Sequence, residues 1–270
     1  MTVQPFFLDS AQGKRFHVLH ASPTPRMTWL YIPPFGEEMN KSRRMITLLG
    51  QALVQCDQAL LIPDLAGCGD SAGELREVTQ DTWVQDIQQS CQWLIDRYPV
   101  PIGLWSLRSG SLTLFKFLEK TPAHHFSCIL WQPVLNGAVF LNQFLRLKVA
   151  ADMALGHKTL TQTLRQQLRE GQPLEIAGYE LPPPLADDWE HTDFTRSAPA
   201  NGRYRWFERL TEATSPLPPS AIAAAQQWQA QGLDVQQQGF TGLPFWQTQE
   251  ITECLPLIQQ SLETLPHARD

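Results

Sequence analysis

The chain has 270 residues, a length that suits one large α/β domain or one domain with a sizeable insertion. Hydrophobic residues make up 43% of it and charged residues 18%, which is an ordinary composition for a globular protein. The formal net charge is −6 and the sequence has no basic stripe, so nucleic acid is excluded as an expected partner.

The sequence indicates neither a metal or cofactor site nor a membrane segment. The 5 cysteines are scattered and form no Cys-x-x-Cys pair, so we expect no disulfide framework, metal or cofactor. Residues 1–15 lack the basic start and apolar core of a signal peptide. The apolar runs are shorter than the roughly 20 residues that a membrane span needs. We therefore expect a cytoplasmic protein.

Short apolar strands alternate with amphipathic helices in the first half of the chain. Residues 15–21 alternate like a half-buried strand, and residues 27–32 form a strand that ends at two prolines, which cannot donate to a ladder. The following predicted elements are a helix at 39–54, a strand at 59–63, a helix at 82–98, a strand at 101–105, a helix at 109–119 and a strand at 127–132. This alternation predicts a mostly parallel sheet with helices on both faces.

The alternation stops near Val134. Residues 137–171 have helical character, and residues 181–201 are rich in proline and acidic residues. Strands and helices then return at 203–209, 218–231, 233–240 and from about 256 to 265. We therefore predict an α/β core formed by residues 1–136 and 202–270, with residues 137–201 inserted as a helical cap over the C-terminal edge of the sheet.

An Asp-x-x-Gly-x-Gly-x-Ser loop follows the strand at 59–63. It runs from Asp64 to Ser71, whose side-chain oxygens can close local turns, while its glycines allow positive φ. The loop resembles the one that follows a central strand in α/β hydrolases. We interpret it as scaffold, with Cys68 as a packing residue.

A second hydrolase-like segment is Gly-Leu-Trp-Ser-Leu-Arg-Ser-Gly-Ser at 103–111. A nucleophile elbow requires small residues two positions before and two positions after its apex, because this strand-to-helix turn is crowded. With Arg108 at the apex, Ser106 and Gly110 occupy the two small positions. A guanidinium is always protonated and is no nucleophile, so this register removes the attacking atom of a serine mechanism.

Two other registers would restore a serine at the apex. With Ser106 there, Leu104 and Arg108 would occupy the positions that need small side chains. With Ser109 there, Leu107 would fail the same test. The elbow candidates are therefore Arg108, Ser106 and Ser109, and the spacing favours Arg108.

The third segment, 238–246, is where an α/β hydrolase carries its catalytic histidine after the last strand. The chain has no histidine between His191 and His267. Glu208 and Glu212 are candidates for the acid that follows the penultimate strand. An acid with neither base nor nucleophile to orient does not make a triad.

Four stretches of the sequence resemble the exosortase A system-associated hydrolase 2 family. They are Pro-Pro-Phe-Gly-Glu-Glu-Met-Asn-Lys-Ser-Arg-Arg at 33–44, Trp-Gln-Pro-Val at 131–134, Gln-Phe-Leu-Arg-Leu-Lys at 143–148 and Pro-Phe-Trp-Gln-Thr-Gln-Glu-Ile at 244–251. The first is the most specific, and the resemblance runs over nearly the whole chain.

The resemblance implies an α/β-hydrolase fold and a bacterial, cytoplasmic accessory protein. It implies an exosortase (PEP-CTERM) system of exopolysaccharide production and protein sorting, whose other proteins are the expected partners. The implied activity is that of an ester or peptide hydrolase, here with a degraded triad. No catalytic residue is carried over, because the hydrolase pattern is broken at Arg108 and near Pro244.

Arg108 is expected to project from the start of a helix at the C-terminal edge of the sheet, where open α/β folds bind ligands. Helix N-termini favour anions, and a guanidinium adds bidentate recognition of carboxylate or phosphate. Arg108 either pairs with Glu37 or Glu38 or holds the anionic group of a small-molecule or peptide ligand. The predicted ligand-binding residues are Phe35, Gly36, Glu37, Glu38, Arg108, Ser109, Gln132 and Trp246.

Two further features have alternative interpretations. The basic run at 41–44 is either a solvated helix face or an anion contact near the pocket mouth. Trp131, Trp206 and Trp246 lie near predicted strand ends, where they either pack in the core or form aromatic platforms for sugars.

Three functions remain open. The first is a hydrolase that uses a serine beside the elbow with Glu37 or Glu38 as base. The second is a non-catalytic binding or regulatory protein that recognises an anionic ligand through Arg108. The third is a protein–protein interaction role carried by the cap.

Overall fold

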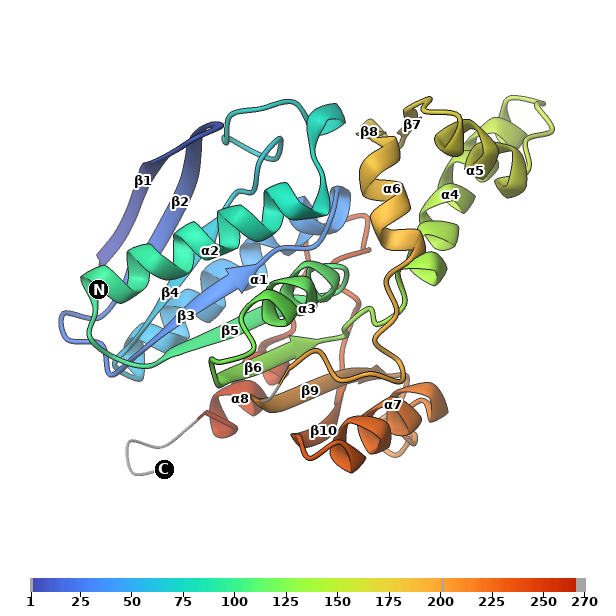
Figure 1. Ribbon diagram of the computed structural model, residues 1–270. Helices are drawn as coiled ribbons and strands as arrows, with labels where there is room; N and C mark the ends of the chain where they lie inside the picture. The colour runs from blue at the N-terminus through green and yellow to red at the C-terminus, as the bar shows by residue number, and fades with distance from the viewer. Residues whose placement is uncertain (1, 201, 266–270) are drawn as a thin grey trace.

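The computed structural model describes residues 2–200 and 202–265 (Figure 1). One eight-stranded sheet has the order β1-β2-β4-β3-β5-β6-β9-β10. β2 is antiparallel to both of its neighbours, and the other adjacent strands are parallel. The bounds are β1 Thr2–Ser10, β2 Gly13–Ala21, β3 Met27–Ile32, β4 Gln58–Pro63, β5 Ile102–Leu107, β6 Phe126–Trp131, β9 Gly202–Leu210 and β10 Asp234–Thr241.

Helices cover both faces of the sheet (Figure 1). One core joins the sheet to α2 (Gln80–Arg97), α3 (Gly110–Lys120) and α7 (Pro219–Ala230). The other joins it to α1 (Glu37–Gln55) and α8 (Leu255–Glu263). Every residue of β3 is buried, because a central parallel strand has an apolar layer on each side. The predicted mostly parallel sheet with two helical layers is therefore confirmed.

The segment between β6 and β9 forms a layer over the ends of the parallel strands (Figure 1). It contains α4 (Gly137–Ala154), α5 (Thr161–Arg169), β7 (Leu174–Ile176), β8 (Tyr179–Leu181) and α6 (Pro183–Glu190). An isolated bridge between Asn136 and Asp193 joins the two chain segments at its base. The helices in this segment follow the predicted helical character, but the β7–β8 hairpin was not predicted.

β1 and the β7–β8 hairpin escaped the sequence prediction for local reasons. β1 is an edge strand that pairs with β2 alone, contains Pro5 and is largely exposed, so it lacks a clear apolar alternation. β7 and β8 have only three residues each, and their turn consists of Ala177 with φ 52° and Gly178 with φ 84°. Two successive positive φ values are typical of a tight hairpin turn.

A buried ion pair fastens β2 to α2. Arg15 Nε lies 2.7 Å from Asp86 Oδ1, and both side chains are about 95% or more buried. The second Asp86 oxygen accepts the amide of Ala66 at 2.7 Å, and Arg15 Nη1 donates to the carbonyl oxygen of Ala72 at 3.2 Å. Burial raises the pKa of Asp86, although these donors and the Arg15 charge act in the opposite direction. The pair thus joins a strand, a helix and the 64–71 loop.

The 64–71 loop has the scaffold role that its sequence indicates. Asp64 accepts a hydrogen bond from the amide of Asp70 at 3.0 Å and pairs with Arg43 at 2.9 Å. The Ser71 hydroxyl donates to the carbonyl oxygen of Asp64 and accepts the amide of Phe16. The loop is therefore bonded to β2 and α1 rather than open to a substrate.

None of the helices within the described residues has a segment long and apolar enough to cross a bilayer.

Candidate functional site

The turn between β5 and α3 has the geometry of a nucleophile elbow with Arg108 at its apex. Arg108 has φ 50°, a left-handed conformation that non-glycine residues rarely adopt. Its amide donates to the carbonyl oxygen of Trp131 at 3.0 Å, and its carbonyl oxygen accepts the amide of Val134 and the hydroxyl of Ser111. Neighbouring residues on β6 and α3 thus fix the backbone of the turn.

A close approach explains why a glycine stands two positions after the apex. A Cβ added at Gly110 would lie 2.4 Å from the carbonyl oxygen of Ile32 and 2.7 Å from that of Pro33. No side chain fits there, because α3 starts directly against the end of β3. The requirement for a small residue two positions after the apex thus follows from the close backbone contact between β3 and α3.

The two serines beside the apex are not placed to attack a substrate. Ser106 is fully buried within β5, and its hydroxyl has no hydrogen-bond partner among the described residues. Ser109 is also buried, and its Oγ accepts the amide of Phe35 at 2.9 Å. Among residues 2–200 and 202–265, neither hydroxyl has a hydrogen bond to a histidine or a carboxylate that could act as a base.

Arg108 is partnered by a glutamate and an aromatic ring. Its Nε lies 3.2 Å from Glu38 Oε1, and its guanidinium carbon lies 5.8 Å from the ring centroid of Trp246. Gln247 Nε2 also donates to Glu38 Oε1 at 3.2 Å. The Arg108 and Glu38 side chains remain 14% and 16% exposed, so the pair lies just beneath the surface. Of the two pairings expected for Arg108, the structure has the one with Glu38.

The Arg108–Glu38 pair has unused hydrogen-bonding capacity. Glu38 Oε2 is buried without a partner, and within the described residues Arg108 bonds only through Nε. A buried carboxylate oxygen without a donor costs free energy, so this oxygen favours an additional partner. The terminal nitrogens of Arg108 can donate to a further acceptor.

Gln132 and Glu208 form a second polar pair at the end of the neighbouring strand. Gln132 has φ 45°, and its Nε2 donates to Glu208 Oε2 at 2.6 Å. Trp206 Nε1 donates to the other oxygen at 2.8 Å. Burial raises the pKa of Glu208, while these two donors and the nearby Arg108 charge lower it.

The two acid candidates differ from the prediction. Glu208 lies within β9 rather than after it, and both of its oxygens are occupied. Glu212 follows β9 but is exposed, and none of its described contacts reaches the elbow. Trp246 is buried in the place expected for histidine, against Phe245 with ring centroids 5.0 Å apart.

Phe35 packs its ring between Ser109, which its own amide contacts, and the segment that joins β6 to β9. Its ring lies 5.2 Å from that of Phe144 and 5.0 Å from that of Trp189, both with edge-on geometry. The remaining cavity, lined by Ser109, Phe35 and Trp189 among others, has a volume of about 10 Å³. Such a space holds about one water molecule, so it has no room for the acyl group of an ester.

The predicted binding residues therefore separate into groups. Glu38, Arg108 and Trp246 meet, and Gln132 lies on the adjoining strand end. Phe35 and Ser109 belong to the packed interior, and Gly36 forms the turn before α1 with φ 64°. Glu37 is exposed and accepts the hydroxyl of Tyr179 on β8.

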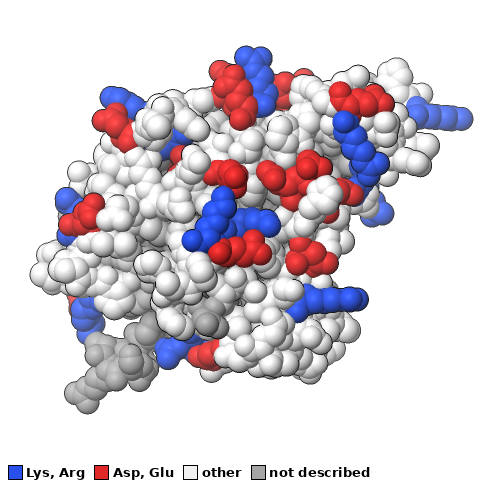
Figure 2. Space-filling view, in the orientation of Figure 1, with Lys and Arg blue, Asp and Glu red and all other residues white. Residues whose placement is uncertain are grey.

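The basic run at 41–44 lies on a face of α1 where Arg43 and Arg44 are exposed to solvent, and each of its three cations has a partner. Arg43 pairs with Asp64, Arg44 pairs with Glu253 at 2.8 Å, and Lys41 donates to the carbonyl oxygen of Gln249 at 2.6 Å. These contacts tie α1 to two distant loops. Figure 2 shows basic and acidic side chains interspersed over one face of the molecule, as expected for such pairing.

The tryptophans near the strand ends pack in the core. Trp131, Trp206 and Trp246 are each at least 96% buried, so none of them is an exposed sugar platform. The described residues contain no cluster of three or more metal-ligating side chains.

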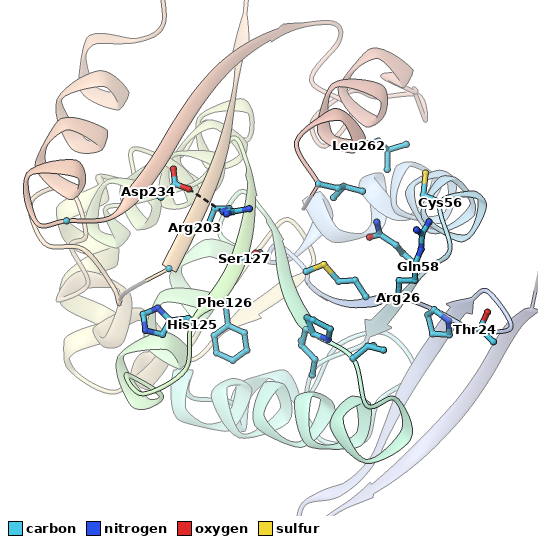
Figure 3. Close-up of a pocket in the computed structure, with 18 residues that line it drawn as sticks. Thr24, Arg26, Cys56, Gln58, His125, Phe126, Ser127, Arg203, Asp234 and Leu262 are labelled. Carbon is cyan, nitrogen blue, oxygen red and sulfur yellow. Dashed lines mark ion pairs between the residues drawn. The ribbon is translucent and has the colours of Figure 1, made fainter. Parts of the chain in front are cut away.

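A large open cavity that was not predicted lies at the opposite edge of the sheet (Figure 3). Its volume is about 1350 Å³, and it lies where the parallel strands begin, with Arg26, Gln58, Ser127 and Arg203 in its wall. Arg203 pairs there with Asp234 at 3.3 Å. None of the predicted binding residues lines this cavity.

The strand order, the two helical layers and the turn after β5 define an α/β-hydrolase fold. A similar structure is Est1E from Butyrivibrio proteoclasticus with ferulic acid bound, at 13% identity and a TM-score of 0.68 over 96% of each chain. A thermostable carboxyl esterase from Bacillus coagulans is 14% identical over 90% of this chain and 91% of its own, with a TM-score of 0.61.

Mouse α/β hydrolase domain-containing protein 10 is 14% identical over 96% of this chain and 97% of its own, with a TM-score of 0.58. No protein-family model and no curated protein matches the chain. At these identities the similarities show the fold.

Proposed function

We propose that the protein is a non-catalytic, ligand-binding member of the α/β-hydrolase fold. The observation that carries the proposal is the guanidinium at the apex of the elbow, with φ 50° at Arg108. A guanidinium does not attack a carbonyl carbon, and Ser106 and Ser109 beside it are buried. The degraded triad therefore corresponds to loss of the serine mechanism.

The ligand of this site carries an anionic group and a hydrogen-bond donor. The anionic group accepts from the free terminal nitrogens of Arg108, because charge-assisted bonds from guanidinium to carboxylate or phosphate are strong and directional. The donor satisfies Glu38 Oε2, which is buried and unpartnered. Glu38 also competes with the ligand for Arg108, since it already holds Nε at 3.2 Å.

The protein acts in the bacterial cytoplasm with an exosortase-linked system of exopolysaccharide production and protein sorting. The support for this part is the sequence resemblance and the arrangement of its four stretches. Phe35 in the first stretch contacts Phe144 in the third, and Glu38 accepts a hydrogen bond from Gln247 in the fourth. Gln132 in the second directly follows β6, the strand that pairs with β5 beside the elbow. Residues of all four stretches that resemble the family therefore lie around Arg108 or contact its neighbours.

A second candidate function is docking of a partner protein on the cap. Five large apolar side chains are exposed on α4 and the loop that follows it: Val139, Leu147, Met153, Leu155 and Leu160. Exposed apolar surface of this kind is typical of interaction sites. In that case Arg108 would have no part in binding.

Incubation with a fluorophosphonate is expected to leave the protein unlabelled, because no activated serine stands at the elbow. Intact-mass analysis checks this, with circular dichroism to show that the protein is folded. The Arg108→Ser variant is also expected to stay unlabelled, since it gains a hydroxyl but no histidine. A stoichiometric adduct on Ser106 or Ser109 of the unmodified chain would contradict the proposal.

Inorganic phosphate is expected to shift the Arg108 side-chain N–H resonances in an NMR titration, because it supplies the acceptor that the terminal nitrogens lack. Arg108→Ala should abolish the saturable binding. Glu38→Gln should tighten binding by about 12- to 150-fold, since a competing charge-assisted bond contributes about 1.5–3 kcal/mol.

The matched control is Arg26→Ala, which removes an exposed arginine at the opposite edge of the sheet that has its own acidic partner, Asp57. Its phosphate affinity should equal that of the unmodified protein. Saturable binding that survives Arg108→Ala would reject Arg108 as the recognition residue and favour the cap.

A further inference from the structure

The outer end of α4 and the loop after it have an apolar surface that no described residue covers. Four of the 11 large apolar side chains that are exposed in residues 2–200 and 202–265 lie within residues 146–160, which we call the cap tip: Leu147, Met153, Leu155 and Leu160. Met153 and Leu155 are 71% and 75% exposed, more than any other of the 11. Single exposed apolar residues are normal, but this concentration within less than a tenth of the chain indicates a binding surface.

The cap tip projects because α4 is longer than the surface on which it packs. The buried residues of α4 all lie between Gly137 and Leu145, whereas residues 146–154 are exposed or half-buried. At a rise of 1.5 Å per residue, this exposed part extends the helix by about 13 Å. Figure 1 shows the end of α4 and the following loop at the outer edge of the molecule, away from the sheet. The tip is therefore a projecting helix end and not the wall of a groove.

One exposed side of this projecting helix lacks the polar residues that usually face water. Leu147, Ala150, Ala151 and Ala154 are all exposed, and their spacing places them on one side of the helix. A helix whose exposed side is apolar is typically covered by another surface. The tip therefore favours a partner that is itself apolar beneath its surface.

The acidic residue of the tip is already bonded within the tip. Asp152 pairs with Lys148 at 3.5 Å and accepts the hydroxyl of Thr159 at 2.6 Å. Its carbonyl oxygen accepts the amide of His157 at 2.9 Å. These bonds hold the loop against α4, so the apolar surface is preformed.

The cap tip is also part of a basic segment in an acidic protein. Residues 137–170 contain five basic and two acidic side chains, a net charge of +3, whereas the whole chain carries −6. Lys148 and Arg165 pair with acidic residues, while Arg146 and Lys158 are exposed and have no acidic partner within the described part of the chain. The tip thus combines two unpaired cations with four exposed apolar side chains.

This combination fits an anionic membrane surface better than a second copy of the chain. In a symmetric dimer the same patch meets itself, so Arg146 and Lys158 would face like charges. Apolar side chains beside basic ones are typical of helices that lie in the membrane interface, where anionic headgroups attract the cations. The acidic remainder of the chain opposes binding only weakly, because charges more than about 8 Å apart are largely screened at physiological salt and the tip projects farther than that.

We infer that the cap tip binds peripherally to a membrane that contains anionic lipids. The four apolar side chains enter the boundary between headgroups and acyl chains, while Arg146 and Lys158 contact the lipid phosphates. The inference does not rest on the Arg108 site. It assigns to a lipid surface the residues that the second candidate function assigns to a protein.

Vesicle flotation of the full chain tests this inference. Vesicles of phosphatidylglycerol and phosphatidylcholine in equal parts should carry the protein upward in a density gradient. Vesicles of phosphatidylcholine alone should bind it about 30-fold more weakly, because each of the two cations contributes about 1 kcal/mol near an anionic surface. Salt at about 1 M should also weaken binding to the mixed vesicles, because the Debye length falls to about 3 Å.

Two double variants separate the apolar and the charged contributions. Met153→Gln with Leu155→Gln should weaken binding to the mixed vesicles by at least about 100-fold, the equivalent of about 1.5 kcal/mol for each apolar side chain. Arg146→Gln with Lys158→Gln should weaken it by about 30-fold. Glutamine has nearly the helix propensity of methionine and arginine, so both variants should fold, which thermal unfolding checks.

The matched controls are Ile95→Gln and Lys14→Gln, which remove an exposed apolar side chain from α2 and an exposed cation from β2. Both should float like the unmodified chain. Arg108→Ala should do the same, so that failure of this inference is distinguishable from failure of the proposed function.

Three results would overturn the inference. They are no flotation of the unmodified chain with the mixed vesicles, equal flotation with phosphatidylcholine alone, and unchanged flotation of the variant with Met153→Gln and Leu155→Gln. The first result would assign the tip to a protein. A dimer in sedimentation velocity that this variant loses would then identify that protein as a second copy of the chain.

Discussion

Replacing Asp86 with alanine is expected to lower the free energy of unfolding by about 3–5 kcal/mol. The change leaves the Arg15 guanidinium buried without its counter-charge, and it also removes the acceptor of the Ala66 amide. Urea denaturation followed by tryptophan fluorescence would measure the loss. An effect of this size is a large fraction of the 5–15 kcal/mol that is typical of a whole domain.

The control for this prediction is Asp57→Asn, which removes the charge that pairs with Arg26 in an ion pair whose two side chains are 62% and 60% exposed, and which keeps a residue type that tolerates the φ of 55° at this position. Exposed pairs contribute about 0–1 kcal/mol, so this variant should be nearly as stable as the unmodified protein. The double change Arg15→Met with Asp86→Leu should recover most of the loss, because it removes both buried charges. Equal costs for Asp86→Ala and Asp57→Asn would show that the buried pair stabilises the fold no more than an exposed pair does.

Gly110→Ala is expected to cost more than about 4 kcal/mol or to prevent folding, which places it among the most damaging single substitutions. Helix propensity alone predicts the opposite, since alanine is favoured over glycine by about 1 kcal/mol within a helix. The steric term dominates, because the new Cβ would lie 2.4 Å and 2.7 Å from two backbone carbonyl oxygens that cannot rotate away. Chemical denaturation, or the soluble yield if the variant does not fold, would measure the effect.

Gly171→Ala is the matched control, because nothing lies within 4 Å of the added Cβ there and only its φ of 81° is unfavourable. A left-handed conformation costs an alanine about 1–2 kcal/mol, so this variant should fold. If Gly110→Ala proved as stable as Gly171→Ala, the close contact between β3 and α3 would be wrong.

The sequence predicted most of the sheet because its central strands are short apolar runs between amphipathic helices. β3 shows why this works: it is buried on both faces, and five of its six residues are apolar or aromatic, so it is recognisable as a short apolar run. β1 could not be recognised, because an exposed edge strand obtains its stability from pairing with β2 and not from its own pattern. The β7–β8 hairpin is too short for any periodicity.

At the candidate site, spacing of small residues indicated that Arg108 stands at the turn, since that rule follows from local backbone crowding. Side-chain contacts between residues far apart in the sequence could not be predicted from local spacing. The position at which α1 begins determines whether Arg108 pairs with Glu37 or with Glu38. The packing of Phe35 above Ser109 depends on its contacts with Phe144 and Trp189, which lie far away in the sequence.

The left-handed turn at Arg108 has one broader consequence. In hydrolases such a turn presents a nucleophile, yet here it occurs with a side chain that cannot attack, so the conformation does not depend on catalysis. Bonds from Trp131, Val134 and Ser111 hold its backbone, and none of them involves the Arg108 side chain. The strain of about 1–3 kcal/mol is therefore sustained by the neighbouring strands. Position 108 would accordingly present any side chain at the same point above the sheet, which allows the chemistry of this site to change while the fold stays the same.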